Sequence, residues 1–181
     1  MVRVGFCGVA GENIMSHLEN QSVLKVRQAL KDAGLEDNVI ALDETARSAE
    51  DAARVLGIEL GAIVKSLVFI VGEQPVMVLV AGDHRCKEDA LPRALALDEE
   101  AKIGVHRADA LEVRAATGFA IGGVAPIAMD LAMPTLLDVS LKRFETIYAA
   151  AGHPHCVFRT DVAALKRLTG CIVSYNIAEP I

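Results

Sequence analysis

The stretch Ile63-Val64-Lys65-Ser66-Leu67-Val68-Phe69-Ile70-Val71 decides the fold of this chain. It is rich in β-branched residues and apolar on both alternating faces, which predicts a central strand that is covered on both sides. The sequence Gly72-Glu73-Gln74-Pro75 that follows predicts a turn, and residues 76–81 predict an antiparallel partner strand. We therefore expect the core to form around this hairpin.

Helix and strand patterns alternate on both sides of the hairpin. Apolar spacing, capping residues and glycine stops predict helices at 22–33, 48–57, 87–97, 110–117, 140–151 and 161–168. Short apolar runs predict strands at 39–42, 103–106, 135–138, 156–158 and 171–177. This alternation predicts an α/β (mixed α+β) domain with a mixed sheet.

Length and composition favour a single domain. The chain has 181 residues, of which 52% are hydrophobic, which suffices for one well-buried core and is short for two domains. Because Met15 begins a segment typical of an ordinary protein start, we interpret residues 1–15 as either an N-terminal extension or the product of an over-called start codon, and residues 16–181 as the domain. Oligomeric state is not readable from the sequence, which leaves a homodimer open.

The charge balance and the cysteines exclude several function classes. A formal net charge of -6 opposes sequence-blind attraction to phosphate backbones, so we expect no DNA partner and only local contact with RNA. With no Trp and 4% aromatic residues, recognition of one terminal nucleotide is compatible with the composition, but a platform for several bases is not. The four cysteines form no Cys-x-x-Cys pair, and neither a secretory signal nor a membrane-length apolar run is present, so we expect a cytoplasmic protein.

Lys65 is the most informative single residue. An ammonium in the middle of a two-sided apolar strand loses hydration that a surface lysine keeps, so some other group should compensate it. In one reading the aliphatic stem packs on the sheet while the amine reaches solvent. In the other, the amine holds an anionic or carbonyl ligand.

The glycine-rich segment 118–126 is a second candidate. Gly118, the pair Gly122-Gly123 and Pro126 are typical of a backbone that approaches a ligand closely and presents amide N–H groups to it. Such donors suit a developing oxyanion. A tight connection between a helix and a strand would use the same glycines, and the sequence leaves both interpretations open.

Further candidates carry weaker signals. Asp83 stands where a strand meets a loop, a place from which it could orient a ligand or cap the next helix. Cys156, close to His153 and His155, could form a Cys-His nucleophile, although a small thiol at the start of an internal strand is more often structural.

Two further side-chain sets concern metals and tRNA. We expect no metal and no cofactor, because His84, Cys86 and His106 lack a recurrent ligand spacing. A local positive surface for tRNA could be formed by Arg107, Arg114, Lys142 and Arg143.

Four segments, in one order along the chain, carry a family resemblance. They are Val64-Lys65-Ser66-Leu67-Val68-Phe69, Ala81-Gly82-Asp83, Thr117-Gly118-Phe119-Ala120-Ile121-Gly122-Gly123-Val124-Ala125-Pro126 and Ala151-Gly152-His153-Pro154. The chain resembles the YbaK/prolyl-tRNA synthetase-associated editing-domain family from about residue 22 to residue 177. The strand lysine combined with the Gly-x-x-x-Pro loop is the specific part. Many relatives close this loop with Pro-x-Gly, whereas Pro126-Ile127-Ala128 ends in alanine here.

The resemblance implies a single domain with a curved mixed sheet flanked by helices. It also implies a free-standing deacylase that acts on the acceptor end of mischarged tRNA, typically proline tRNA carrying alanine or cysteine. Lys65 matches the family's active-site lysine. Gly122 and Gly123 match the loop that grips the aminoacyl carbonyl, with Val124 beside them and Pro126 shaping the loop. The remaining residues that it places at the substrate are Gly118, Asp83, Gly152 and His153.

Two other functions remain open at this stage. One is a non-catalytic module that binds a nucleotide or a small metabolite in the same cavity, and it predicts ligand binding without deacylation. The other is a hydrolase that depends on Cys156 and would be inactivated by thiol alkylation. The deacylase interpretation requires the Lys65 ammonium and the amides of Gly122 and Gly123 to open onto one cavity.

Overall fold

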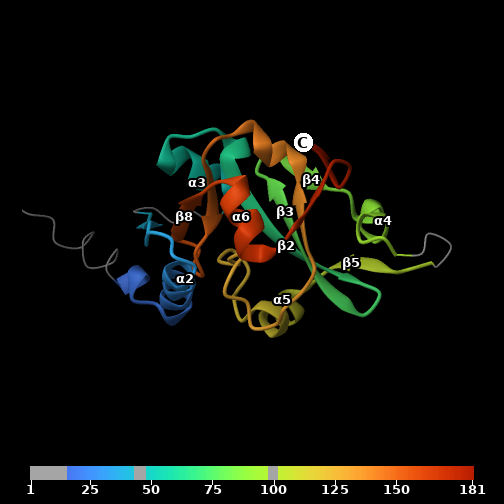
Figure 1. The fold of residues 1–181 in the computed structure, drawn as a ribbon, viewed down its shortest axis with the longest axis horizontal. Helices are drawn as coiled ribbons and strands as arrows, with labels where there is room; N and C mark the ends of the chain where they lie inside the picture. Colours follow the sequence, from blue (N-terminus) through green and yellow to red (C-terminus); the bar gives the residue numbers. More distant parts are fainter. Residues whose placement is uncertain (1–15, 43–47, 98–101) are drawn as a thin grey trace, which may run out of the picture.

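The computed structural model describes residues 16–42, 48–97 and 102–181, so the expected extension at 1–15 lies outside the described residues. Its centre is an eight-stranded mixed sheet with the order β1-β8-β7-β2-β3-β6-β9, in which β5 also pairs with β2 (Figure 1). Strands β10 and β4 form a separate two-stranded sheet. The strands are β1 (Val39–Ala41), β2 (Ile63–Val71), β3 (Gln74–Ala81), β4 (His84–Cys86), β5 (Val105–Arg107), β6 (Thr135–Asp138), β7 (Ile147–Ala150), β8 (Cys156–Thr160), β9 (Ile172–Ser174) and β10 (Ala178–Pro180).

Strand β2 is central, as its apolar pattern predicts. It pairs with β3 in antiparallel register from Val64–Ala81 to Val71–Gln74, and in parallel with β7. One core cluster contains Val64 and Val68 of β2, and a second contains Phe69 and Val71. Because successive side chains of a strand point to opposite faces, both faces of this hairpin are buried.

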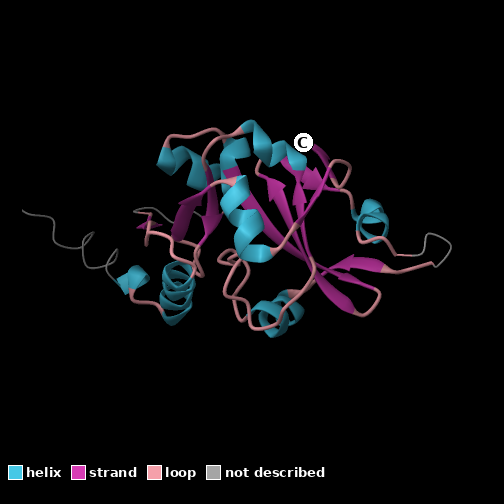
Figure 2. Ribbon diagram, in the orientation of Figure 1, coloured by secondary structure: helices cyan, strands magenta, loops and turns pink. Residues whose placement is uncertain are grey.

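The helices surround the strands (Figure 2). Local capping chemistry sets their ends as predicted: Ser48, Asp109 and Asp161 accept backbone N–H groups of the first turns of α3, α5 and α6, and left-handed glycines end these helices. In α2 the buried face is Val23, Val26 and Leu30. The helices are α2 (Gln21–Asp32), α3 (Ala49–Leu56), α4 (Leu91–Ala94), α5 (Ala110–Thr117) and α6 (Val162–Thr169), with 3₁₀ turns at Leu60–Ala62, Glu88–Ala90 and Val139–Arg143.

Three predicted elements are wrong. The helix expected at 87–97 is a 3₁₀ turn followed by the short α4, which has Pro92 in its first turn. The helix expected at 140–151 is a 3₁₀ turn followed by β7, because pairing with β2 and β8 outweighs the local helix signal. The terminal strand expected at 171–177 is shorter: β9 ends at Ser174 and pairs with β6, and the separate strand β10, which pairs with β4, begins only at Ala178.

In the described ranges, every helix falls short of the length and apolarity that a membrane crossing requires.

Candidate active site

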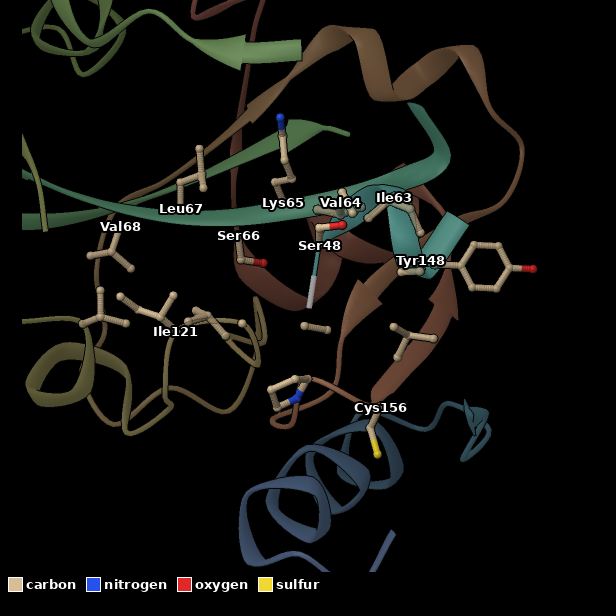
Figure 3. Close-up of a pocket in the computed structure, with 18 of the residues that line it drawn as sticks. Ser48, Ile63, Val64, Lys65, Ser66, Leu67, Val68, Ile121, Tyr148 and Cys156 are labelled. Atoms are coloured by element: carbon tan, nitrogen blue, oxygen red, sulfur yellow. The ribbon is translucent and has the colours of Figure 1, made fainter. Parts of the chain in front are cut away.

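A cavity of about 320 Å³ opens below β2 and is enclosed by several elements (Figure 3). Its walls are mainly apolar. Ser48 at the start of α3 and Arg107 of β5 also line it. The remaining lining residues are Ile63–Val68 of β2, Ala49, Ala52, Ala108, Val113, Ile121, Gly122, Val124, Tyr148, Ala150, Pro154, Cys156 and Val157.

Ser66 presents the polar side chain of β2 to this cavity. Its side chain leaves the strand on the same side as Val68, the side on which Ile121 also lies (Figure 3). The Oγ atom is buried and has no hydrogen-bonding partner among the described residues. A buried hydroxyl without a partner carries a desolvation cost, so a ligand group that bonds to it would recover stability. Ser66 is not among the site residues predicted from the sequence, although it is visible there as a polar residue that interrupts an apolar strand.

Lys65 lies on the opposite face of the strand. Lys65 is among the residues that line the cavity, but its side chain leaves β2 on the side away from Ser66 (Figure 3), and Nζ donates to the carbonyl oxygen of His84. Desolvation lowers the pKa of the Lys65 ammonium, and the nearby carboxylates of Glu50 and Asp83 oppose this shift. The prediction that the Lys65 amine and the double-glycine amides open onto one cavity is therefore wrong for this side-chain position, because successive side chains of a strand point to opposite faces. A deacylase function must rest on the cavity and its other polar groups, with the amine acting from the opposite face of β2.

Asp83 does not cap a helix. Its carboxylate accepts hydrogen bonds from Arg143 Nη2 at 2.7 Å and 2.9 Å, and it lies 2.7 Å from His84 Nδ1. Burial alone would raise the pKa of the Asp83 carboxyl, but the hydrogen bonds from Arg143 and His84 outweigh it and the pKa is lowered. Asp83 and Arg143 thus form an ion pair on the Lys65 side of β2, outside the cavity lining.

The glycine-rich loop forms the wall opposite β2. Gly122 adopts a left-handed conformation with φ 93° and lines the cavity together with Val124. The N–H of Gly123 donates to the Ala120 carbonyl oxygen at 3.0 Å, so it is not available to a ligand as it lies. The N–H of Gly122 has no such bond within the described ranges and is the amide of the pair that could serve as a donor.

The other loop residues act behind this wall. Gly118 ends α5 with φ 76°, and a Cβ there would clash with the Asp130 carboxylate. Pro126 is buried and is absent from the cavity lining. The glycine and the proline therefore shape the loop from outside the cavity.

A turn after β7 holds the loop in place. A Cβ on Gly123 would lie 2.8 Å from the backbone of His153, and a Cβ on Gly152 would lie 2.5 Å from the Ser22 carbonyl oxygen. Pro154 reaches the cavity, but His153 is absent from its lining and stacks on the His17 ring with centroids 4.8 Å apart. Gly152 and His153 therefore position the wall through close packing.

A thiol mechanism finds no support in the geometry. Cys156 lines the cavity but is fully buried, and desolvation raises the pKa of its thiol to about 11, so it stays protonated at neutral pH. Within the described ranges, no group of three metal-ligating side chains is placed to hold an ion. Of the four basic residues proposed for tRNA contact, Arg107 reaches the cavity, whereas Arg143 is held by Asp83 and Arg114 donates to the Gly118 carbonyl.

Comparison with known proteins assigns the chain to a family. Residues 43–168 match the model of the family described as the aminoacyl-tRNA editing domain. The chain belongs to this family, and its single α/β domain has the YbaK-like editing-domain fold.

Individual relatives give the same picture. The chain is 33% identical over 132 residues to the uncharacterized protein YwhH of Bacillus subtilis (strain 168), covering 72% of this chain and 80% of that protein. It is 34% identical over 103 residues to the proline--tRNA ligase of Lactobacillus helveticus (strain DPC 4571), covering 57% of this chain but only 17% of the ligase. A crystal structure provisionally described as a trans-editing enzyme for prolyl tRNA synthetase superposes with a TM-score of 0.80 and 34% identity, over 88% of this chain and 98% of that chain.

Proposed function

We propose that this chain is a free-standing trans-editing deacylase that hydrolyses the ester bond of mischarged tRNA, with proline tRNA carrying alanine or cysteine as its substrate. The observation that carries the proposal is the cavity itself, where apolar walls meet an unpartnered hydroxyl on β2 and a free glycine amide on the facing loop. Its volume of about 320 Å³ suits the end of one aminoacylated nucleotide.

The chemistry needs positioning more than a protein nucleophile. An aminoacyl ester is already activated, so its hydrolysis requires a placed water and donors aimed at the developing oxyanion. The Gly122 N–H is one such donor. The apolar residues Val64, Val124 and Val157 enclose a small side chain and exclude bulk water.

We assign Lys65 to a phosphate of the tRNA acceptor end. Its amine lies on the face of β2 opposite the cavity. Arg107, which lines the cavity, is close enough for its positive charge to contribute to the lowering of the Lys65 pKa. An acceptor strand that passes over the edge of β2 would place its aminoacyl group in the cavity and a phosphate on the Lys65 side. Contacts to phosphates give affinity for the tRNA but do not distinguish one nucleotide sequence from another.

A panel of charged tRNAs tests the proposal. Proline tRNA carrying alanine, cysteine, serine or proline, and alanine tRNA carrying alanine, are incubated with the protein, and the loss of radiolabelled amino acid is followed. We expect proline tRNA with alanine or cysteine to be deacylated and correctly charged tRNAs to be spared. Saturable binding without hydrolysis of any of them would instead support the non-catalytic binding module.

A matched pair of variants links activity to the cavity. Ala150→Leu places three further carbon atoms in the lining and should reduce deacylation at least tenfold by excluding the substrate. Ala163→Leu adds the same volume on the exposed face of α6 and should leave the rate unchanged. Equal rates in both variants would place the reaction elsewhere.

A further inference from the structure

Strand β2 has one open edge beside the cavity. Strand β3 pairs with β2 along almost its full length. On the other side β7 pairs with Ile63 and Val64, and β5 pairs with residues 69–71. The described residues thus supply no partner strand to residues 65–68 on that side, and we call this segment the open edge.

The hydrogen-bond pattern shows which backbone groups face the open edge. The Gly82 N–H donates to the Ile63 carbonyl oxygen at 2.8 Å, so odd-numbered residues of β2 direct their backbone groups toward β3. Two contacts of even-numbered residues agree with this. Ile70 lies opposite Pro75, which has no N–H to donate to it. The carbonyl oxygen of Val68 accepts from the Ala108 N–H at 3.0 Å, on the side of β2 away from β3. The even-numbered residues, Ser66 among them, therefore direct theirs away from β3.

Ser66 consequently offers three polar groups to one cavity. Its backbone N–H and C=O lie on the open edge and have no hydrogen-bonding partner among the described residues, and its buried Oγ has none either. Buried backbone groups are almost always paired. An open edge inside a cavity wall is thus a place where an extended ligand can complete the sheet.

We propose that Ser66 binds the aminoacyl group as if it were one residue of an adjacent strand, an inference that rests on the proposed deacylase function. An aminoacyl ester has the same N–Cα–C=O unit as a strand residue, and two opposed strand residues exchange a pair of N–H to O=C bonds. The α-ammonium of the substrate donates to the Ser66 carbonyl oxygen, and the Ser66 N–H donates to the ester carbonyl oxygen.

This pairing makes Ser66 a catalytic residue. Water adds to the ester carbonyl carbon, and the Ser66 N–H stabilises the negative charge that develops on the carbonyl oxygen. The bond from that carbon to the ribose oxygen then breaks. The ribose oxygen leaves with the electron pair and takes up the proton that the water lost, giving the free amino acid and a ribose hydroxyl.

Replacing one backbone atom tests the donor. Ser66→Ala is compared with a protein in which lactic acid, the α-hydroxy analogue of alanine, occupies position 66, so that an ester linkage replaces the amide and removes the N–H. We expect the lactic acid protein to be about 100-fold slower in kcat/KM than Ser66→Ala. The deleted N–H has no partner in the fold, so the melting temperature should fall only slightly, because the ester weakens the Lys65 carbonyl as an acceptor toward β3 without removing a complete hydrogen bond.

Phe69 provides the matched control, because it is absent from the cavity lining and its backbone groups point toward β3. Replacing it with its own α-hydroxy analogue removes a backbone hydrogen bond to β3, so it should lower the melting temperature and keep kcat/KM within about threefold. Equal kcat/KM for Ser66→Ala and the lactic acid protein would overturn the inference.

The substrate side is tested with minihelices of proline tRNA that carry alanyl, lactyl or propionyl esters. Each enzymatic rate is divided by the spontaneous hydrolysis rate of the same ester, since the ammonium also activates the ester chemically. We expect the propionyl ester to lose roughly 10- to 100-fold relative to the alanyl ester, the cost of one hydrogen bond to a charged group. Equal corrected rates would refute the ammonium contact. If the wild-type protein deacylates none of the charged tRNAs, the proposed function itself fails, which is a different result.

Discussion

Lys65 and Ser66 are neighbours in sequence, yet they serve opposite faces of β2. The Lys65 ammonium is bound to the His84 carbonyl oxygen and faces the ion pair of Asp83 and Arg143, whereas Ser66 faces the cavity. A ligand that reaches both residues must cross the strand at its open edge. The lysine therefore suits a phosphate contact, and the serine suits the reacting group.

Removing the charge of Lys65 should weaken tRNA binding with little change in the chemical step. Lys65→Met keeps the aliphatic stem, so we expect KM to rise and the slope of log KM against log salt to fall by about one, which corresponds to one lost phosphate contact. Steady-state deacylation at several salt concentrations measures both. Lys166→Met, an exposed position of α6, should change neither quantity. A fall in kcat at an unchanged salt slope would contradict the phosphate role.

Ala128 occupies a backbone conformation that favours glycine. Its φ is 59°, in the left-handed region that glycine adopts without steric cost. A left-handed conformation costs a Cβ-bearing residue roughly 1–2 kcal/mol, part of which the greater freedom of an unfolded glycine offsets. We expect Ala128→Gly to raise the free energy of unfolding by about 0.5 kcal/mol, measured by urea denaturation. A loss of stability in this variant would show that the alanine methyl group contributes packing that outweighs the strain.

At the scale of elements, the Gly118–Pro126 loop and the turn at residues 152–155 form one packed unit. Gly123 allows their backbones to approach, because a Cβ there would lie 2.8 Å from His153 Cα and 2.9 Å from the Gly152 carbonyl carbon. The turn also places Pro154 in the cavity lining. The loop and the turn must therefore move together if either one shifts.

Gly123→Ala should separate these two elements. Because the contacted atoms belong to the backbone, the strain has no easy relief, and we expect a loss of about 1–3 kcal/mol in stability together with reduced deacylation. Gly104→Ala is the matched control, because a Cβ at Gly104 meets nothing within 4 Å. Thermal melts and single-turnover rates of both variants, compared with wild type, provide the test. Equal behaviour of the two variants would exclude the close approach.

Elements whose ends depend on neighbouring residues could be predicted from the sequence, whereas elements that depend on pairing with distant strands could not. The helix ends at Ser48, Asp109 and Asp161 follow from caps that act within four residues, and β2 follows from its apolar run. Strand β7 was mistaken for a helix because its state depends on pairing with distant strands. The same limit applies to the site: the glycine loop could be recognised from its sequence, but the free backbone groups of Ser66 depend on where β5 and β7 stop pairing.

At the scale of the whole molecule, three histidines connect the segment before α2 to the cavity wall. The His17 ring stacks on His153 and His155 with centroid distances of 4.8 Å and 4.4 Å. Pro154, between the last two, lines the cavity. Residues that are distant in sequence thus share one small cluster next to the loop of the candidate active site.

Acid should destabilise the fold through this cluster. Desolvation lowers the pKa of His17 and His153, and repulsion from neighbouring imidazoles lowers it further. Since the folded-state pKa values lie below the ordinary value of about 6.5, the unfolded chain binds protons more readily. The stabilising contribution is therefore complete above pH 6.5 and is lost as the pH falls from 6.5 through the lower folded-state values. Urea midpoints measured between pH 7.5 and 5 should decline below pH 6.5. His17→Gln removes one titrating ring and one source of repulsion on His153, so the urea midpoint should decline less steeply with falling pH in this variant. If the midpoint declines as steeply as in the wild type, the histidine cluster is not the origin of the acid sensitivity.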